Sequence, residues 1–494
     1  MIFNKHSKTL VLAVLLTALS CTNKPKNIAQ TTTDVKTETE QPNILLVLCD
    51  DLGYSDVGFN GSTDIKTPEL DRLASAGTIF TSAYVAHPFC GPSRAALLTG
   101  RYPHTIGSQF NLPANGESLG KGIDTKEQFI AKTLQESGYY TGAIGKWHLG
   151  ATEEFHPNQR GFTDFYGFLG GGHNYFPEQY QAQYQKQKKA KKKIIRDYIL
   201  PLEHNGKEVK ETEYLTDAFS REASRFIKEA STKNKPFFLY LAYNAPHVPL
   251  EAKEEDLEEF SAIKDKDRRT YAAMVYAVDR GVGTIVNTLK ETHQLENTLI
   301  IFLSDNGGNT DHGATNFPLH GRKGDTWEGG YRVPMFMYWP KNIAKGEKYS
   351  FPITSLDLYP TLAHLGKAKV PNDKILNGKN AWESIVANKN PHKKETLFAM
   401  RHREGYTDVS ARRDEWKALK VNRQPWKLFK ITEDISEKND LSAAHPDIIK
   451  ELVNDAEQWS KSHTEPLWFD PTYLQEMWKD STMATFNNTF AVPK

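Results

Sequence analysis

Short and almost continuous runs of apolar residues recur along this chain, and each ends abruptly in polar residues. Residues 43–49 read NILLVLC and are followed by two aspartates, and residues 298–303 read TLIIFL and are followed by the triplet SDN. A third run, FFLYLAY, covers residues 237–243. Runs of this kind are typical of parallel β-strands that are buried on both faces of a sheet.

Between these runs, apolar residues recur at spacings of three or four. Residues 215–227 and 271–289 keep this spacing and predict two amphipathic helices. Strands that alternate with helices indicate an α/β fold with a large, mixed and mainly parallel sheet flanked by helices. Sites in such sheets form beyond the carboxyl ends of neighbouring strands, so we expect the polar residues after positions 49 and 303 to meet.

The pattern changes after about residue 366. Residues 416–421 and 426–431 predict strands of a smaller sheet, and residues 446–459 predict an amphipathic helix. We therefore expect a main domain over residues 42–365 and a C-terminal α+β subdomain over residues 366–494. The tail from residue 467 to residue 490 is rich in aromatic residues, which either pack on the main domain or stack on a sugar.

The N-terminus predicts export. Two lysines precede an apolar run over residues 10–19, which is too short to span a bilayer and is typical of a signal peptide covering residues 1–21. The sequence ALSC, which ends at Cys21, resembles a bacterial lipobox and predicts lipidation of that cysteine, although an ordinary signal peptide stays open. Residues 22–41 then predict a flexible tether. We expect a periplasmic protein or an outer-membrane lipoprotein, with membrane contact only through the lipid.

Composition excludes nucleic acid as a bulk partner, because 62 basic side chains face 61 acidic ones and the net charge is only +1. The one strong charge run, QKQKKAKKK over residues 185–193, is either a solvated surface or a contact for a polyanionic substrate. The chain has three cysteines, Cys21, Cys49 and Cys90, which is too few for a disulfide framework in a protein of this size. We expect Cys49 to pack as a small apolar residue.

A candidate reactive group lies in the stretch CGPSRAALLTGR, which starts at Cys90. Pro92 suits the first turn of a helix, so Cys90 should stand at the helix start, where unpaired backbone N–H groups attract anions. Arg94 is four residues further on and can share a helix face with Cys90. The alternative is a buried cysteine beside a surface arginine.

The acidic strand ends predict a metal site. Asp50, Asp51, Asp305 and Asn306 offer only oxygen ligands, which hard divalent cations prefer, and Ca²⁺ tolerates irregular geometry better than Mg²⁺. A single pair of this kind would be a capping or turn motif. Two pairs, each after a buried strand, favour a metal ion.

Two further segments carry cations and proton carriers. In TGAIGKWHLG, residues 141–150, an extended backbone would project Lys146 and His148 to the same side, where they suit an anion and a proton transfer. The alternative is a strand end with an exposed lysine and a packed histidine. His247 lies between two prolines in YNAPHVP, and a lone histidine in such a place is more often structural than catalytic.

Several blocks together resemble type I sulfatases. The stretch CGPSRAALLTGRYPHTIG resembles their first signature, TGAIGKWHLG their second, and GRKGDTWEGGYRVP, residues 321–334, a later block. Five blocks follow the family's order over about residues 42–365. Residues 170–175 and 316–320 look most like the branch that includes N-acetylgalactosamine-4-sulfatases and bacterial polysaccharide sulfatases. The resemblance implies an alkaline-phosphatase-like fold and hydrolysis of a sulfate ester.

The resemblance also implies roles for individual residues. A maturation enzyme would oxidise Cys90 to formylglycine (3-oxoalanine), the nucleophile, although Gly91 stands where the family commonly has serine or threonine. One Ca²⁺ would bind this residue and the four oxygen-bearing side chains at the strand ends. The catalytic set would be Cys90, Arg94, Lys146, His148, His247 and Lys323, with Lys323 touching the sulfate, while His173 and His312 would select the substrate.

The expected substrate is a sulfated polysaccharide, such as an algal galactan of the carrageenan type, ulvan or a glycosaminoglycan. One alternative is a phosphatase or phosphonate monoester hydrolase, because the related fold also serves phosphoryl transfer. Another is an inactive surface lipoprotein that binds polysaccharide.

Overall fold

A computed structural model describes residues 41–113, 120–478 and 489–490 of the chain. The predicted signal peptide, Cys21 and nearly all of the predicted tether lie outside the described residues. None of the helices in the described ranges is long and apolar enough to cross a membrane.

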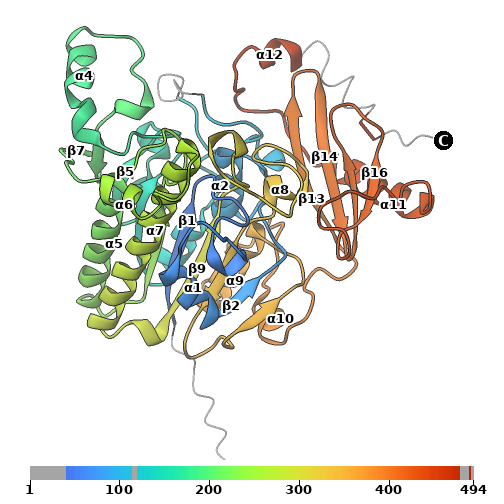
Figure 1. The fold of residues 1–494 in the computed structure, drawn as a ribbon, viewed down its shortest axis with the longest axis horizontal. Helices are drawn as coiled ribbons and strands as arrows, with labels where there is room; N and C mark the ends of the chain where they lie inside the picture. Colours follow the sequence, from blue (N-terminus) through green and yellow to red (C-terminus); the bar gives the residue numbers. More distant parts are fainter. Residues whose placement is uncertain (1–40, 114–119, 479–488, 491–494) are drawn as a thin grey trace, which may run out of the picture. The chain divides into compact units, whose positions relative to one another are not determined.

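A ten-stranded sheet forms the centre of the fold, in the order β11-β2-β10-β9-β1-β8-β4-β5-β6-β7 (Figure 1). The five central strands, from β9 to β5, run parallel, while β10 and β6 pair antiparallel with their neighbours. The prediction of a mixed, mainly parallel sheet is therefore confirmed. The strands are β1 (Asn43–Cys49), β2 (Thr78–Phe80), β4 (Tyr140–Lys146), β5 (Asp164–Phe168), β6 (Leu202–His204), β7 (Lys207–Val209), β8 (Phe237–Ala242), β9 (Thr298–Ser304), β10 (Met335–Tyr338) and β11 (Glu347–Tyr349).

The three apolar runs became the three middle strands because each is covered on both faces. Along β1, Leu46 packs in the core on one side of the sheet and Val47 in the core on the other, and both are fully buried. This alternation follows from the two-residue period of a strand. Cys49 packs in one of these cores, as expected, and both Cys49 and Cys90 are free cysteines.

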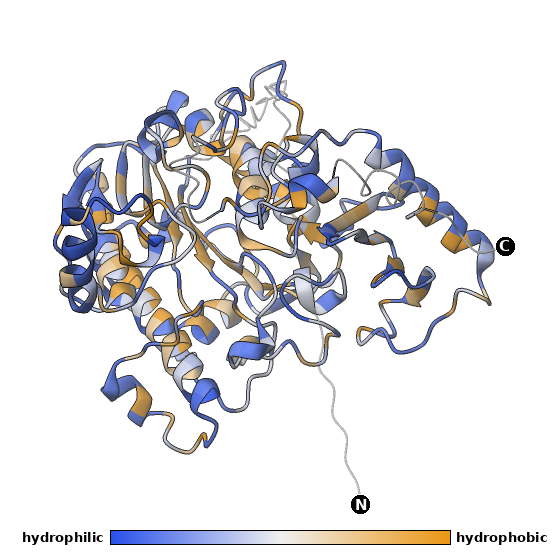
Figure 2. Cartoon of the chain, turned by 90° about the horizontal axis from the view of Figure 1, so that it is seen from above, coloured by the Kyte–Doolittle hydropathy of each residue, from blue (hydrophilic) through white to orange (hydrophobic). Residues whose placement is uncertain are grey.

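Helices cover both faces of the sheet. One face packs against α1 (Pro68–Ser75), α5 (Leu215–Ser231) and α7 (Lys266–Glu291), and the other against α2 (Cys90–Thr99), α3 (Ile130–Glu136) and α9 (Leu358–Leu365). The two amphipathic helices predicted from the sequence lie within α5 and α7. Figure 2 shows the resulting distribution, with hydrophobic residues gathered on the central strands and on the inner sides of the helices.

A second sheet of four antiparallel strands follows in the C-terminal part, and we call it the small sheet. Its strands are β13 (Thr396–Arg403), β14 (Tyr406–Arg413), β15 (Trp416–Lys420) and β16 (Lys427–Lys430), with α11 (Pro446–Ser460) packed against them. The sequence predicted β15, β16 and α11 but not the β13–β14 hairpin. Ala381 and Ile385, which precede this sheet, still pack in the core of the large sheet.

A buried ion cluster joins the small sheet to helix α8 (Glu328–Tyr331), which follows the large sheet's strand β9 in the chain. Lys417 of β15 lies 2.9 Å from Glu328 of α8 and 2.7 Å from Glu437, and all three side chains are fully buried. In the tail, Trp468 packs in the core of the large sheet and donates a hydrogen bond to the Phe110 carbonyl (2.8 Å). The sequence left two possibilities for the aromatic residues of the tail, packing on the main domain or stacking on a sugar. Trp468 packs on the main domain.

The remaining α-helices and strands are short, apart from one helix that carries part of the basic run. They are α4 (Pro177–Lys189), α6 (Glu254–Glu258), α10 (Trp382–Val386), α12 (Leu474–Met477), β3 (Ala83–Tyr84) and β12 (Ile353–Thr354). Lys186, Lys188 and Lys189 lie in the last turn of α4, where they are exposed, and Lys188 donates to Glu208 (3.0 Å). The run is thus solvated over this turn.

Candidate active site

Two acidic strand ends lie side by side at the carboxyl edge of the central sheet. Strands β1 and β9 are parallel neighbours whose last residues pair in register, so Asp50 and Asp51 leave the sheet level with Asp305 and Asn306. The Asp51 N–H donates to Oδ1 of Asp305 (3.3 Å). All four residues are buried, with at most 3% exposure. The polar strand ends that the sequence predicted to meet are therefore together.

Helix α2 brings the cysteine and arginine of the first signature to these strand ends. Cys90 is its first residue and is buried, and Pro92 lies in the first turn, where its missing N–H leaves no hydrogen bond unmade. One turn on, the buried Arg94 donates from Nε to Oδ2 of Asp305 (2.8 Å), and its Nη2 lies 3.8 Å from Oδ2 of Asp50. Arg94 therefore fixes the helix start against both acidic strand ends.

Two lysines face the same carboxylates. Lys146, the last residue of β4, donates to Oδ2 of Asp50 (2.6 Å), and Lys323 donates to Oδ2 of Asp51 (2.8 Å). Burial alone would lower the pKa of Lys323, but Asp51, Cys90 and Asp50 together raise that pKa well above its usual range. The Lys323 ammonium is thus permanently positive, which suits the binding of an anion.

His148 reaches the site by a route different from the predicted one. Its backbone has a φ of 62°, in the left-handed region, so the extended conformation that would have projected Lys146 and His148 to one side does not continue to position 148. Its side chain lies beside α2 instead: a Cβ at Gly91 would be 3.5 Å from Cε1, and a Cβ at Gly171 would be 2.9 Å from Nε2. Burial, with the Lys146 and Arg94 charges, lowers the pKa of His148 well below its ordinary value.

His247 lies on the other side of the cluster, beside Asp51. Its Nε2 is 3.8 Å from Oδ2 of Asp51, and its Nδ1 is 2.7 Å from the Val248 carbonyl oxygen. A carbonyl oxygen can only accept, so Nδ1 carries the proton and Nε2 is the atom turned towards the site. Burial lowers the pKa of His247, which keeps the ring neutral near pH 7.

A model of the sulfatase family matches residues 42–368 of the chain. Mouse arylsulfatase J is 30% identical over 472 residues, which cover 86% of this chain and 76% of that protein. Mouse N-acetylgalactosamine-6-sulfatase is 33% identical over 356 residues, covering 69% of this chain and 65% of that protein. The solved structure of Ps i-CgsB in complex with k-i-k-neocarrahexaose is 57% identical, with a TM-score of 0.90 and coverage of 92% and 100%.

The chain belongs to the sulfatase family.

Membership settles the enzyme class: this sulfatase is a sulfuric ester hydrolase. It also places the ten-stranded sheet in the alkaline-phosphatase-like fold expected from the resemblance. The relatives compared are a 6-sulfatase and an arylsulfatase, whereas the sequence motifs looked most like the branch with the 4-sulfatases. The branch within the family therefore stays a prediction.

The donor set of this sulfatase fits a metal ion. Asp50 belongs to two groups whose ligand atoms lie within 4.8 Å of one another, one with Cys90 and Asp305 and one with Asp51 and His247. Carboxylates this close repel one another, and burial together with the Asp50 charge raises the pKa of Asp305 to about 7. A cation beside them would relieve that repulsion.

Two buried oxygen atoms also indicate a metal ion at this place. Oδ1 of Asp50 and Oδ1 of Asn306 are buried and accept no hydrogen bond from any described residue. Buried acceptors without a partner are rare, and an ion is one of the usual reasons for them. With oxygens dominating the donor set, a hard divalent cation is the fitting occupant.

The two predicted substrate-selecting histidines have other surroundings. His173 is buried, and both ring nitrogens lie 2.7 Å from backbone carbonyl oxygens, of Asn174 and Leu200, so the ring ties two loops together. His312 stands on the short helix η7 (Thr310–His312) after the Asp305 strand end, with Nδ1 2.9 Å from the Asn309 amide nitrogen. Their contact with substrate stays a prediction, and for His173 the backbone already uses both nitrogens.

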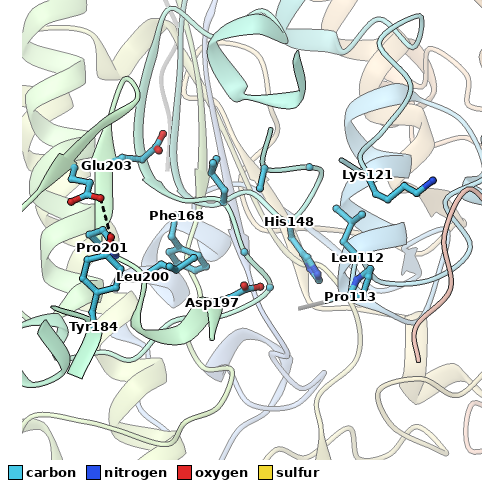
Figure 3. A pocket seen from close by; sticks show the side chains of 16 residues that line it. Leu112, Pro113, Lys121, His148, Phe168, Tyr184, Asp197, Leu200, Pro201 and Glu203 are labelled. Carbon is cyan, nitrogen blue, oxygen red and sulfur yellow. Dashed lines mark hydrogen bonds between the residues drawn. The ribbon is translucent and has the colours of Figure 1, made fainter. Parts of the chain in front are cut away.

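A cleft of about 220 Å³ opens beside His148. Figure 3 shows His148 with Leu112 and Pro113 on one side of it and Tyr184 and Pro201 on the other. Its lining mixes apolar surface with carboxylates and other polar groups, as pockets for small molecules commonly do. It gives His148 access to a bound molecule although the ring itself is buried.

Sequence reasoning missed Asn111. Its Oδ1 accepts a hydrogen bond from the Gly91 N–H (2.9 Å) and lies 3.7 Å from the Cys90 Sγ. It therefore contacts the start of α2 at the reactive position. Asn111 lies 21 residues after Cys90 in an irregular loop, and neither periodicity nor a motif marks it.

Proposed function

We propose that this sulfatase removes sulfate from a carrageenan-type galactan, with a formylglycine made from Cys90 and one Ca²⁺. The observation that carries the reaction is the position of Cys90, at the first residue of α2 and in one buried cluster with both acidic strand ends and both lysines. The observation that supports the substrate is the likeness over the whole of Ps i-CgsB, whose structure holds a neocarrahexaose.

The state of the thiol argues against the thiolate as the nucleophile. Burial raises the pKa of Cys90, and Asp50 and Asp305 raise it further, against the opposing effect of Lys146 and Lys323. A thiol nucleophile would need the opposite shift, because the thiolate is the reactive form. The hydrated aldehyde would instead supply one hydroxyl to attack sulfur and a second one whose deprotonation lets the sulfate leave.

The charged side chains of the chain have clear tasks in this scheme. Arg94, Lys146 and Lys323 neutralise the sulfate oxygens, and their burial strengthens each interaction. His148, beside α2, takes the proton from the second hydroxyl. His247, on the Asp51 side, would first take up a proton at Nε2 and then, beside the Lys323 ammonium, deliver it to the leaving sugar oxygen.

Ca²⁺ would be held by Asp50, Asp51, Asp305 and Asn306 together with the modified residue 90. It would add positive charge where the sulfate oxygens bind. The oxygen donors and the two unpartnered buried oxygens support this part of the proposal.

The cellular setting completes the proposal. The apolar run over residues 10–19 and Cys21 support export to the bacterial periplasm or attachment to the outer membrane through a lipid. A maturation enzyme that oxidises Cys90 is then a required partner. Activity would depend on whether the host supplies it.

Assays on a panel of substrates test the proposal. We expect ion chromatography to detect sulfate released from carrageenan oligosaccharides, with less from ulvan or glycosaminoglycan fragments and no phosphate from phosphate monoesters. Phosphate release at a higher rate would favour the phosphatase alternative. An inactive protein with an unmodified Cys90 thiol, isolated from its native host, would favour the polysaccharide-binding alternative.

A further inference from the structure

A second cleft, of about 520 Å³, opens on the Phe89 side of Cys90. Phe89 and Asn111 line it from the catalytic part, and Arg401 and Arg403 line it from β13 of the small sheet. Asn111 is the residue whose amide oxygen lies 3.7 Å from the Cys90 Sγ. The cleft therefore includes a residue that contacts the reactive position, and its lining shares no residue with the cleft beside His148.

Arg401 is the candidate residue for binding an anion in this cleft. Its guanidinium carbon lies 4.4 Å from the centre of the Phe89 ring, and its Nη1 donates to the Gly324 carbonyl oxygen (2.7 Å). Gly324 permits this approach, since a Cβ there would be only 1.8 Å from that nitrogen. Burial and the neighbouring Arg403 charge lower the pKa of Arg401 to about 10. Both effects oppose an isolated cation at this position.

Arg403, two residues along the same strand, shows the contrast. It forms ion pairs with Asp408 and with Asp325 (3.0 Å). No ion pair joins Arg401 to a carboxylate among the residues the structure describes. One arginine of the cleft is thus paired directly with carboxylates, whereas the charges of Asp325 and Asp408 act on Arg401 without an ion pair.

The same cleft also offers groups that suit sugar hydroxyls. Glu404 and Asp470 line it together with Gln109, so carboxylate and amide oxygens stand near the arginines. An inorganic anion alone would meet these acidic groups unfavourably. A sugar ring that carries one anionic substituent matches both kinds of group, because its hydroxyls can donate to the oxygens.

We propose that this cleft binds the sugar next to the one that loses its sulfate, and that Arg401 binds a second sulfate on that neighbouring sugar. This inference rests on the proposed function and adds a subsite to it. Phe89 links Arg401 to the catalytic lysine. Its ring lies under the Arg401 guanidinium, and the centre of the ring is 5.0 Å from the Lys323 Nζ. Binding of the second sulfate thus positions the oligosaccharide substrate beside the catalytic lysine.

Kinetics of Arg401→Gln on two matched oligosaccharides test the subsite. The two share a backbone and the same scissile sulfate, and only one carries sulfate on the neighbouring sugar. We expect KM for the doubly sulfated substrate to rise about tenfold, as for the loss of one charge-assisted hydrogen bond, with kcat changed by less than about twofold. We expect little change on the singly sulfated substrate. Arg401→Lys should recover part of the loss.

Arg413→Gln is the matched control, because Arg413 lies at the opposite end of the same hairpin and pairs with Glu451 and Asp455. It should leave KM for both substrates unchanged. An equal loss on both substrates with Arg401→Gln, or no loss on either, would overturn the subsite. Absence of sulfate release by the wild-type enzyme from both substrates is a separate outcome, which would overturn the proposed function itself.

Discussion

Asp50 and Asn306 each turn one buried oxygen towards the site without a hydrogen-bond donor among the described residues, while Arg94, Lys146 and Lys323 crowd the remaining carboxylate oxygens. At the scale of single residues, the site is a balance of buried charges. Removal of one partner from such a cluster leaves its neighbours uncompensated. Binding of a cation at this cluster is therefore the first thing to measure.

Thermal unfolding with and without Ca²⁺ tests the metal site independently of activity. We expect chelation to lower Tm and Ca²⁺ to restore it, because a ligand at a hundredfold excess over its Kd stabilises the native state by about 2.7 kcal/mol. Asn306→Ala should remove most of this Ca²⁺-dependent shift, since it deletes an oxygen ligand without changing charge. Differential scanning fluorimetry is sufficient.

Asn309→Ala is the control for this measurement. Asn309 lies three residues further on, where its side chain accepts from the Asp311 N–H and contacts His312. It should keep the full Ca²⁺ shift. The metal assignment fails if Ca²⁺ changes Tm equally in both variants or leaves the wild-type Tm unchanged.

Single residues also mark the limit of what the sequence could predict here. Asp50 and Asp305 were predictable because each follows an unmistakable buried strand. The direction of the His148 side chain was not predictable. His148 itself has a left-handed backbone, which redirects the side chain, and histidine has no strong preference for that conformation. Arg401 could not be found either, because it comes from a different sheet, far away in the sequence.

At the scale of elements, the strands that the sequence predicted are those with both faces covered, such as β1, β8 and β9. The antiparallel additions β2, β6, β7 and β10 are short, and their pairing depends on long-range contacts that local patterns do not encode. The β13–β14 hairpin was missed for a similar reason. Its strands carry many charged residues, which the fold pairs with partners elsewhere.

A buried histidine and aspartate interact at the start of helix α9. Asp357 completes a capping box with Thr354 at the 3-10 helix that precedes α9, and it also receives a hydrogen bond from the buried His392 (2.8 Å). Burial would lower the pKa of His392, but the hydrogen bond and charge of Asp357 raise the pKa above the ordinary value of 6.5. The protonated histidine therefore stabilises the native state.

This interaction predicts a pH dependence of stability. Because the native-state pKa is raised, the stabilisation is fully present below pH 6.5 and is lost as the pH rises through the native-state value. Urea unfolding of wild type and His392→Gln should thus show a difference in unfolding free energy that is largest at acidic pH and narrows at alkaline pH. His364→Gln, at an exposed position in the last turn of α9, should show no such trend. A constant difference for His392→Gln would contradict the assignment.

At the scale of the whole molecule, the active site depends on parts of the chain that are distant in sequence. The large sheet supplies the acidic strand ends, α2 supplies Cys90, and the small sheet supplies Arg401. The buried Lys417 cluster joins that small sheet to α8. One cleft opens beside His148, and another is lined by Asn111 and Arg401.

The central claim is that a group made from Cys90 hydrolyses the sulfate ester. The most direct measurement is the rate of sulfate release from a carrageenan hexasaccharide by wild type, Cys90→Ala and Cys49→Ala, all produced in a host that forms formylglycine. Cys49 is the matched cysteine, buried in the core and free. We predict that wild type and Cys49→Ala release sulfate at similar rates and that Cys90→Ala falls to the background rate. Sulfate release by Cys90→Ala at the wild-type rate would contradict the account.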